Sequence, residues 1–223
     1  MPRVARAAPA GYPQHVINRA VMRFRIFDSD ADYRLFEQLL EDCVAETGMH
    51  VLAYCLMPNH WHLVLNPSEE GLLSMFMHKL TNAHTRRVHI KTETVGTGPL
   101  YQGRYKSFLI EDDVHLLTVL KYVERNAVRA KLSARAEDWR WGSAWRRTCG
   151  TQKQRQLLAP PLTPLPSDYK TWINEPEPSE LLKEVRTSVS KGVPFGTLSW
   201  VEKTIKAFGL EQTRRTVGRP SRK

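Results

Sequence analysis

Two histidines flank a tryptophan in the stretch CLMPNHWHLVL, and their type and spacing could hold a metal ion. His60 and His62 stand in an apolar run that follows a Pro-Asn turn signal. If this run is a strand, alternate side chains share a face, so both imidazoles point one way and Trp61 points the other. Two such imidazoles can chelate a cation when another group completes the site. A lone His-X-His triplet also occurs by chance on half-exposed strands, so further residues must support this interpretation.

Further candidates lie on a helix predicted from Asp112 or Asp113 to about Ala130, whose core stripe is Leu116, Leu120, Val123 and Ala127. Tyr122 and Asn126 are one turn apart and share a different face of that helix. A tyrosine hydroxyl could attack phosphorus and become covalently linked, while the two imidazoles and the Asn126 carbonyl oxygen could hold a divalent cation. The ordinary alternatives are a half-buried aromatic residue and a solvated amide.

The elements that must position these residues follow the order β-α-β-β-α-β, with the tyrosine-bearing helix last. Hydrophobic periodicity and turn signals predict strands over 13–27, 49–57, 60–66 and 103–111, and helices from Ser29 to Gly48 and over 68–90. This order is typical of the ferredoxin-like α+β fold, a four-stranded antiparallel sheet with two helices on one face. The fold alone does not indicate a function.

The C-terminal third differs in composition from the rest of the chain. The sequence predicts a catalytic-type domain over 1–150, an extended Pro-rich linker over 151–178 and a small helical extension with a basic tail over 179–223. The linker includes APPLTPLPSDYKTWINEPEP, which contains six prolines.

The overall charge indicates a polyanionic partner. The chain of 223 residues holds 33 Lys and Arg against 23 Asp and Glu, which gives a formal net charge of +10. Nucleic acid is the commonest partner of such proteins.

No apolar run approaches the ~20 residues of a membrane span, and the N-terminus lacks the hydrophobic segment of a secretory signal. The three scattered cysteines form no disulfide or metal pattern. We therefore expect a cytoplasmic protein without membrane attachment.

Taken together, these motifs resemble one known family. His60-Trp61-His62 is similar to the His-hydrophobic-His motif of the single-tyrosine HUH transposases, and YVERNAVRA is similar to their tyrosine helix. The stretches HVINR, MPNHWHLVL and GRYKS, with the C-terminal KGVPFGTLSWVEKTIKAFGL, resemble the REP-associated tyrosine transposases. The sequence departs at Ala127, where many relatives have proline after the asparagine.

The resemblance implies an enzyme that cleaves and rejoins single-stranded DNA at hairpin-forming intergenic repeats through a 5′-phosphotyrosine. Carried over by position, Tyr122 is the nucleophile, and His60, His62 and Asn126 bind the metal. Both Mg²⁺ and Mn²⁺ are used in the family. The resemblance also implies a bacterial protein that acts as a monomer, although related elements form dimers.

Basic residues near these motifs are candidates for phosphate contacts, and each could instead be a solvated charge or an ion-pair partner. They are Arg19, Arg104, Lys106, Arg125, Arg129, Arg214 and Arg215.

Other functions remain open from the sequence. A non-catalytic nucleic-acid-binding protein on the same sheet is the main alternative, but no strand has the aromatic pattern of RNA-recognition modules. A zinc hydrolase would need a third histidine and a general-base carboxylate. Tyr101 and Tyr105 are rival nucleophiles, although packing or base stacking is expected of them.

Overall fold

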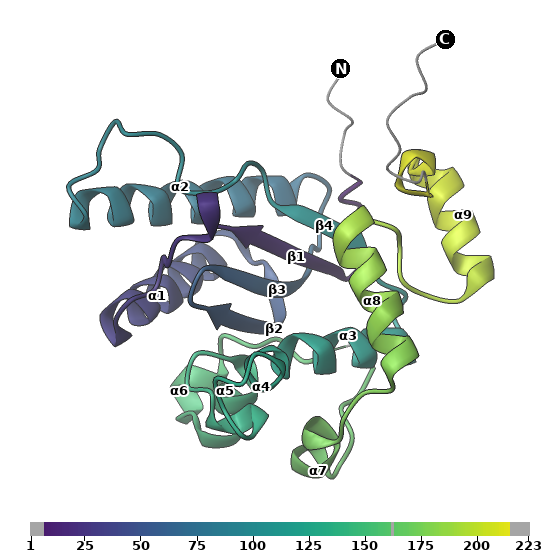
Figure 1. Ribbon diagram of the computed structural model, residues 1–223. Helices are drawn as coiled ribbons and strands as arrows, with labels where there is room; N and C mark the ends of the chain where they lie inside the picture. The colour runs from purple at the N-terminus through teal and green to yellow at the C-terminus, as the bar shows by residue number, and fades with distance from the viewer. Residues whose placement is uncertain (1–6, 162, 215–223) are drawn as a thin grey trace.

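The computed structural model describes residues 7–161 and 163–214, and it places a four-stranded antiparallel sheet at the centre (Figure 1). The strands are β1 (Gln14–Arg19), β2 (His50–Met57), β3 (His60–Asn66) and β4 (Lys106–Leu109), in the spatial order β2-β3-β1-β4. The hairpin β2-β3 turns at Pro58-Asn59, as the sequence predicted. This order confirms the ferredoxin-like arrangement.

The two helices between the strands cover one face of the sheet. They are α1 (Asp30–Thr47) and α2 (Leu72–Lys91). Helix α1 begins after Ser29, whose backbone N–H donates to Asp32 Oδ2 at 2.9 Å, and ends at Gly48, which adopts a left-handed φ of 70°. Trp61, Leu63 and Leu65 of β3 are fully buried among the apolar side chains of α1 and α2.

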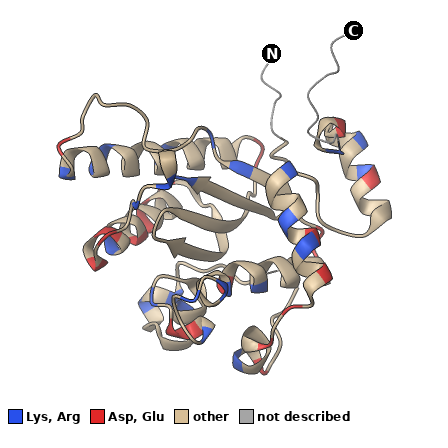
Figure 2. Cartoon of the chain, in the orientation of Figure 1, with Lys and Arg blue, Asp and Glu red and all other residues tan. Residues whose placement is uncertain are grey.

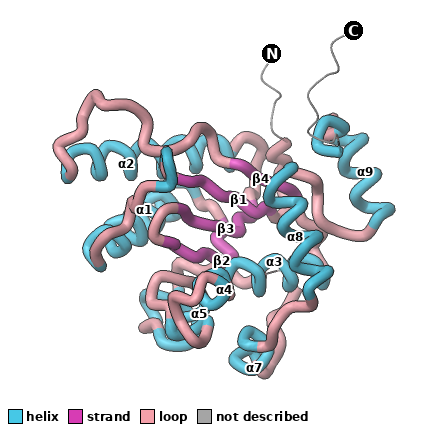
Figure 3. Tube along the Cα trace, in the orientation of Figure 1, coloured by secondary structure: helices cyan, strands magenta, loops and turns pink. Residues whose placement is uncertain are grey.

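The opposite face is covered by α3 (Val114–Glu124) and α8 (Ser179–Lys191), as the arrangement of strands and helices in Figure 3 shows. Val64 of β3 and Phe108 of β4 pack there against Leu116, Val119 and Val185. The predicted third helix is therefore interrupted: it ends at Glu124, and a separate turn of helix, α4 (Asn126–Arg129), follows Arg125.

Along the part of the chain that the structure describes, four further helices follow α4, three of them before α8 and one after it. They are α5 (Ser143–Cys149), α6 (Gln152–Arg155), α7 (Tyr169–Asn174) and α9 (Leu198–Phe208), with 3-10 turns η1 (Val21–Arg23), η2 (Ala136–Asp138) and η3 (Glu211–Arg214). The segment 151–178 was expected to be an extended linker, but α6 forms at its start, where the Thr151 side chain caps it, and α7 forms near its end. The reason for α7 is apolar burial: Ile173 is 0% exposed and packs with Ala136 and Ala144.

The C-terminal segment is attached to the sheet through backbone and side-chain hydrogen bonds. Phe195 N donates to Leu109 O at 2.8 Å, and Glu111 N donates to Phe195 O at 2.9 Å. The Glu111 carboxylate also accepts from Thr197 N at 2.5 Å, at the start of α9. Among the described residues, no helix has both the length and the apolarity needed to cross a bilayer.

Candidate active site on the polar face of the sheet

Strand pairing places three histidines on the face that α3 covers. In the register of the sheet, His60 lies opposite Arg19, His62 opposite Ile17, and His15 opposite Val64. Trp61 belongs to the apolar cluster on the other face. The expected division of β3 into a histidine face and a tryptophan face is therefore confirmed, and His15 of β1 joins the pair.

The ring nitrogens of the two predicted metal ligands are partly engaged. His60 Nδ1 lies 2.6 Å from Asn59 Oδ1, which accepts its proton, so His60 Nε2 keeps a lone pair. His62 Nδ1 lies 2.7 Å from His15 Nε2. When His62 donates this hydrogen bond, its Nε2 is also free to bind a cation.

The imidazoles are held neutral, which is the form that binds metal. Burial, reinforced by the charge of Arg19, lowers the pKa of His60 to about 4. Burial alone lowers the pKa of His15 to about 3. Burial is also the main reason why the pKa of His62 lies well below its usual range. All three rings are therefore uncharged at neutral pH.

Tyr122 of α3 lies beside these imidazoles. Its ring centroid is 6.1 Å from that of His62 and 6.3 Å from that of His15. The guanidinium carbon of Arg129 lies 4.1 Å from the Tyr122 ring centroid, within the range of a cation–π interaction. Tyr122 is 8% exposed. The fold thus brings the predicted nucleophile next to His62 and His15 from elements that are far apart in the sequence.

The rival tyrosines lie in the other hydrophobic cluster. Tyr101 and Tyr105 both pack in the core between the sheet, α1 and α2. The Tyr101 hydroxyl accepts from Trp61 Nε1 at 2.9 Å and lies 2.6 Å from His84 Nδ1, and burial raises its pKa. These contacts give Tyr101 a structural role away from the histidine pair.

Asn126 begins α4, directly after the break in the helix. The neighbouring Ala127 backbone N–H contacts the Cys55 thiol, and Cys55 pairs with His62 across the sheet. The Asn126 Nδ2 atom is buried and has no hydrogen-bond partner among the residues that the structure describes. This unpaired Nδ2 group is a hydrogen-bond donor and cannot bind a cation, so a ligand role would fall to the Asn126 oxygen. Two imidazoles and an amide oxygen form a donor set that suits Mn²⁺.

The seven basic residues predicted to contact phosphate fall into three groups. Arg19, Arg104 and Lys106 line one groove of about 400 Å³ between the sheet and α8, with Val189 and Ser190 on its far wall. Basic residues of β4 and α8 border this region in Figure 2. Lys106 of β4 and His62 of β3 both pair with Ile17 of β1. Lys106 in the groove and His62 in the site therefore lie at the same level across the sheet.

The other two groups are placed differently. Arg125 and Arg129 are held by Glu177, at 2.7 Å each, so their guanidinium groups serve ion pairs within the protein. In the tail, Arg214 lies 3.9 Å from Glu202, and Arg215 falls outside the described residues.

Three residues that contribute to the site were not predicted: His15, Asn59 and Glu177. His15 lies in the HVINR stretch, and strand alternation puts it on the same face as Arg19, which was an available signal. Asn59 was identified only as a turn residue. For Glu177 the sequence offers no signal, since its partners are about fifty residues away.

A second cluster of possible metal ligands lies at the start of α3. The ligand atoms of Glu111, Asp113 and His115 are all within 4.8 Å of one another. However, Asp113 Oδ1 accepts from the backbone N–H of His115 at 2.7 Å and so caps α3, while Glu111 binds Thr197. These contacts account for the cluster as helix capping.

Comparison with known proteins bears on the fold and on the family. No curated protein matches the chain. Among solved structures, a REP-associated tyrosine transposase bound to a REP hairpin is similar to this protein, with a TM-score of 0.56 and 15% identity over 71% of this chain and 89% of that one. A transposase candidate from Deinococcus radiodurans R1 has a TM-score of 0.39 and 18% identity, over 58% of this chain and 92% of that one.

The family comparison extends beyond the fold. The model of the family described as "Transposase IS200 like" matches residues 11–126, more than half of the chain, and this range includes His60, His62, Tyr122 and Asn126. The protein therefore belongs to the IS200-like transposase family.

Proposed function

We propose that the protein is a metal-dependent endonuclease and transposase that cleaves and rejoins single-stranded DNA through a 5′-phosphotyrosine at Tyr122. The observation that carries this proposal is the proximity of the Tyr122 ring to the His62 and His15 rings, at 6.1 and 6.3 Å between centroids. Apolar side chains would fill a sheet face at a lower cost, because burial of polar groups is unfavourable, yet His15 and His62 are buried here and His60 is half-buried.

In the proposed reaction, the Tyr122 hydroxyl attacks the scissile phosphorus. The new bond joins Tyr122 Oη to phosphorus, the bond from phosphorus to the 3′ oxygen breaks, and a proton passes to that oxygen to leave a free 3′-hydroxyl. Attack of a 3′-hydroxyl on the phosphotyrosine reverses these steps and rejoins the strand. His60 Nε2, His62 Nε2 and Asn126 Oδ1 would hold Mg²⁺ or Mn²⁺, which when bound polarises the phosphate oxygens.

Single-stranded DNA with hairpin-forming repeats is the proposed substrate. The net charge of +10 and the groove of Arg19, Arg104 and Lys106 support an anionic strand that runs to the histidine site. The structural neighbour with a REP hairpin has the same fold. Arg214 and Arg215 of the tail would add phosphate contacts. We further propose that the chain acts as a monomer in the bacterial cytoplasm.

The decisive experiment is a search for the covalent intermediate. The purified protein is incubated with end-labelled single-stranded hairpins from the repeats that flank its gene, with Mn²⁺, and the products are separated under denaturing conditions. A labelled protein band of shifted mobility is expected. Absence of such a band with every flanking repeat, and with both metals, would contradict the proposal.

The burial of Tyr122 favours a second candidate function. At 8% exposure, its side chain is poorly accessible in this conformation, as it would be in a protein that only binds DNA. The same assay separates the two functions, because a binding protein retains the hairpin under native conditions and yields no adduct under denaturing ones.

A further inference from the structure

One carboxylate of the segment between α7 and α8 contacts the residues around Tyr122. Glu177 lies between α7 and α8, and its side chain is only 4% exposed. Its Oε2 accepts from Arg125 Nε at 2.7 Å, and its Oε1 accepts from Arg129 Nη1 at 2.7 Å. A single buried carboxylate therefore pairs with one buried and one half-buried arginine, whose charges would be unfavourable to bury without a partner.

These two arginines enclose the junction between Tyr122 and Asn126. Arg129 lies over the Tyr122 ring at 4.1 Å and also donates to the Tyr122 backbone oxygen. Arg125 occupies the break between α3 and α4, and its Nη1 donates to Ile173 O at 3.0 Å. Asn126 follows Arg125 directly. The position of the nucleophile relative to the proposed amide ligand is thus coupled to Glu177.

Two neighbouring prolines restrict the backbone at Glu177. Pro176 and Pro178 flank it on both sides. Proline restricts its own φ and disfavours the helical region for the residue before it, so both Glu175 and Glu177 are restricted to extended backbone. Because few conformations are lost on folding, the entropic cost of fixing Glu177 is reduced.

We infer that Glu177 is a positioning residue for strand cleavage. It holds Arg125 and Arg129 so that the Tyr122 ring keeps its place beside His62 and His15, and so that Asn126 keeps its place after the break at Arg125. This inference rests on the proposed function. Glu177 lies outside the range 11–126 that the family model matches, so a residue beyond that range would help to position the active site.

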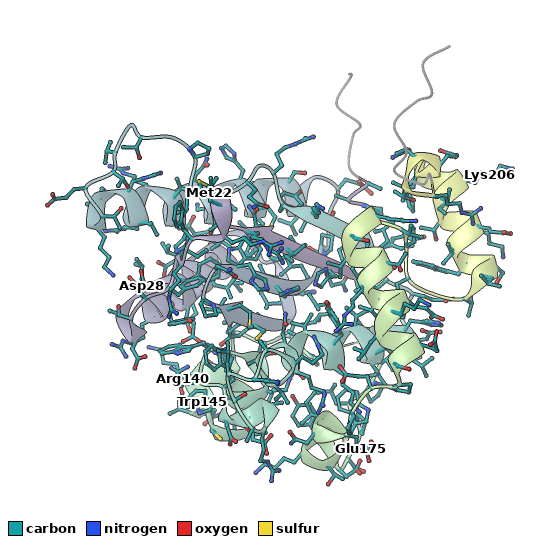
Figure 4. All side chains as sticks on the ribbon, viewed as in Figure 1. Met22, Asp28, Arg140, Trp145, Glu175 and Lys206 are labelled. Carbon is teal, nitrogen blue, oxygen red and sulfur yellow. The ribbon has the colours of Figure 1, made fainter. Side chains whose placement is uncertain are left out.

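The test compares two glutamates of the same segment in the full-length protein. Glu177→Gln removes the charge that holds both arginines. Glu175→Gln is the matched control, because Glu175 has a 62% exposed side chain, contacts only Lys121 at 3.8 Å among the ion pairs described, and lies beside α7 (Figure 4). Adduct formation is followed in single turnover at saturating hairpin with Mn²⁺, and hairpin affinity is measured separately.

We expect Glu177→Gln to slow adduct formation at saturation ~10–100-fold, as misplacement of reacting groups does, with hairpin affinity nearly unchanged. Glu175→Gln should keep the wild-type rate. An NMR spectrum of ring-labelled tyrosine, assigned with Tyr122→Phe, should show that the Tyr122 ring signal moves in Glu177→Gln and stays in Glu175→Gln. Equal or faster cleavage by Glu177→Gln would overturn the inference, and so would an unmoved Tyr122 signal.

Loss of folding must be separated from loss of positioning. If Glu177→Gln does not fold, Glu177→Asp keeps the charge with a shorter reach, and it should fold yet cleave more slowly at saturation than the wild type. A Glu177→Asp protein as fast as the wild type would then refute the positioning role. If the wild-type protein itself forms no adduct, the proposed function fails, and that outcome is distinct from a failure confined to Glu177.

Discussion

The two faces of the sheet are buried to a similar extent but differ in chemistry. On β3, Trp61, Leu63 and Leu65 fill the apolar core beneath α1 and α2, while His60 and His62 alternate with them toward α3. The first face gains stability from apolar burial. The second holds imidazoles whose pKa values burial lowers, which is unfavourable for folding. Both faces contain apolar clusters, and the second face also carries the residues of the proposed site, so we infer that it combines packing with chemistry.

The largest expected effect is on the polar face. Tyr122→Phe should abolish the covalent adduct and leave hairpin affinity nearly unchanged, because it removes one hydroxyl and keeps the ring against Arg129. Denaturing electrophoresis of the labelled complex measures this. Tyr101→Phe is the control from the other face and should keep the adduct. An adduct that survives in Tyr122→Phe would place the nucleophile elsewhere.

Removal of a proposed metal ligand should also stop cleavage. His60→Ala is expected to form no adduct, since the cation would lose one of two imidazoles. Mn²⁺ at ~100 times its dissociation constant should stabilise the wild type by ~2.7 kcal/mol, and this gain should vanish in His60→Ala. Thermal unfolding with and without Mn²⁺ and a chelator measures the difference. An unchanged metal response in the variant would contradict the assignment.

The apolar face should show the reverse pattern. Leu63→Ala is expected to lower the free energy of unfolding by ~2–5 kcal/mol, because it opens a cavity at a fully buried position. The adduct should still form at low temperature, where the variant stays folded. Urea unfolding gives the free energy. A small loss of stability combined with lost cleavage would reverse the roles of the two faces.

A titratable group on the apolar face should produce a pH-dependent loss of stability. Burial lowers the pKa of His84 to about 3, whereas the unfolded chain titrates near 6.5. Below pH 6.5 the unfolded state therefore binds more protons, and stability falls as the pH falls, by ~1.4 kcal/mol per pH unit from this residue. Urea unfolding at pH 7 and pH 5 should show a smaller loss of unfolding free energy for His84→Gln than for the wild type. An equal loss in both proteins would disprove this account.

The smallest expected effect concerns phosphate contacts. Arg104→Gln should weaken hairpin binding and reduce the slope of log affinity against log salt by ~0.7–0.9, the value for one phosphate contact. Arg34→Gln on α1 is the control, and its slope should equal that of the wild type. Titrations at several salt concentrations decide this. Equal salt slopes for Arg104→Gln and Arg34→Gln would show that Arg104 does not contact a phosphate.

Local signals in the sequence were sufficient for most elements. The hairpin at Pro58-Asn59 and the limits of α1, with Ser29 before it and Gly48 after it, follow from turn and capping chemistry. The sequence did not indicate the helix break at Arg125, because Ala127 favours a continuous helix and the partners of Arg125 are the distant Ile173 and Glu177. The sequence did not indicate helix α7, because the prolines on both sides of it were more conspicuous than its three apolar residues, Tyr169, Trp172 and Ile173.

The sequence alone determined which residue types share a face, since alternation along a strand and spacing along a helix depend only on local geometry. It therefore indicated His60, His62, Tyr122 and Asn126 as one candidate site. Tertiary structure decided what those residues contact: His15 reaches His62 only through the register of β1 with β3, and Glu177 reaches Arg129 only through the path of the segment between α7 and α8. Such contacts depend on the packing of distant segments, which no local periodicity encodes.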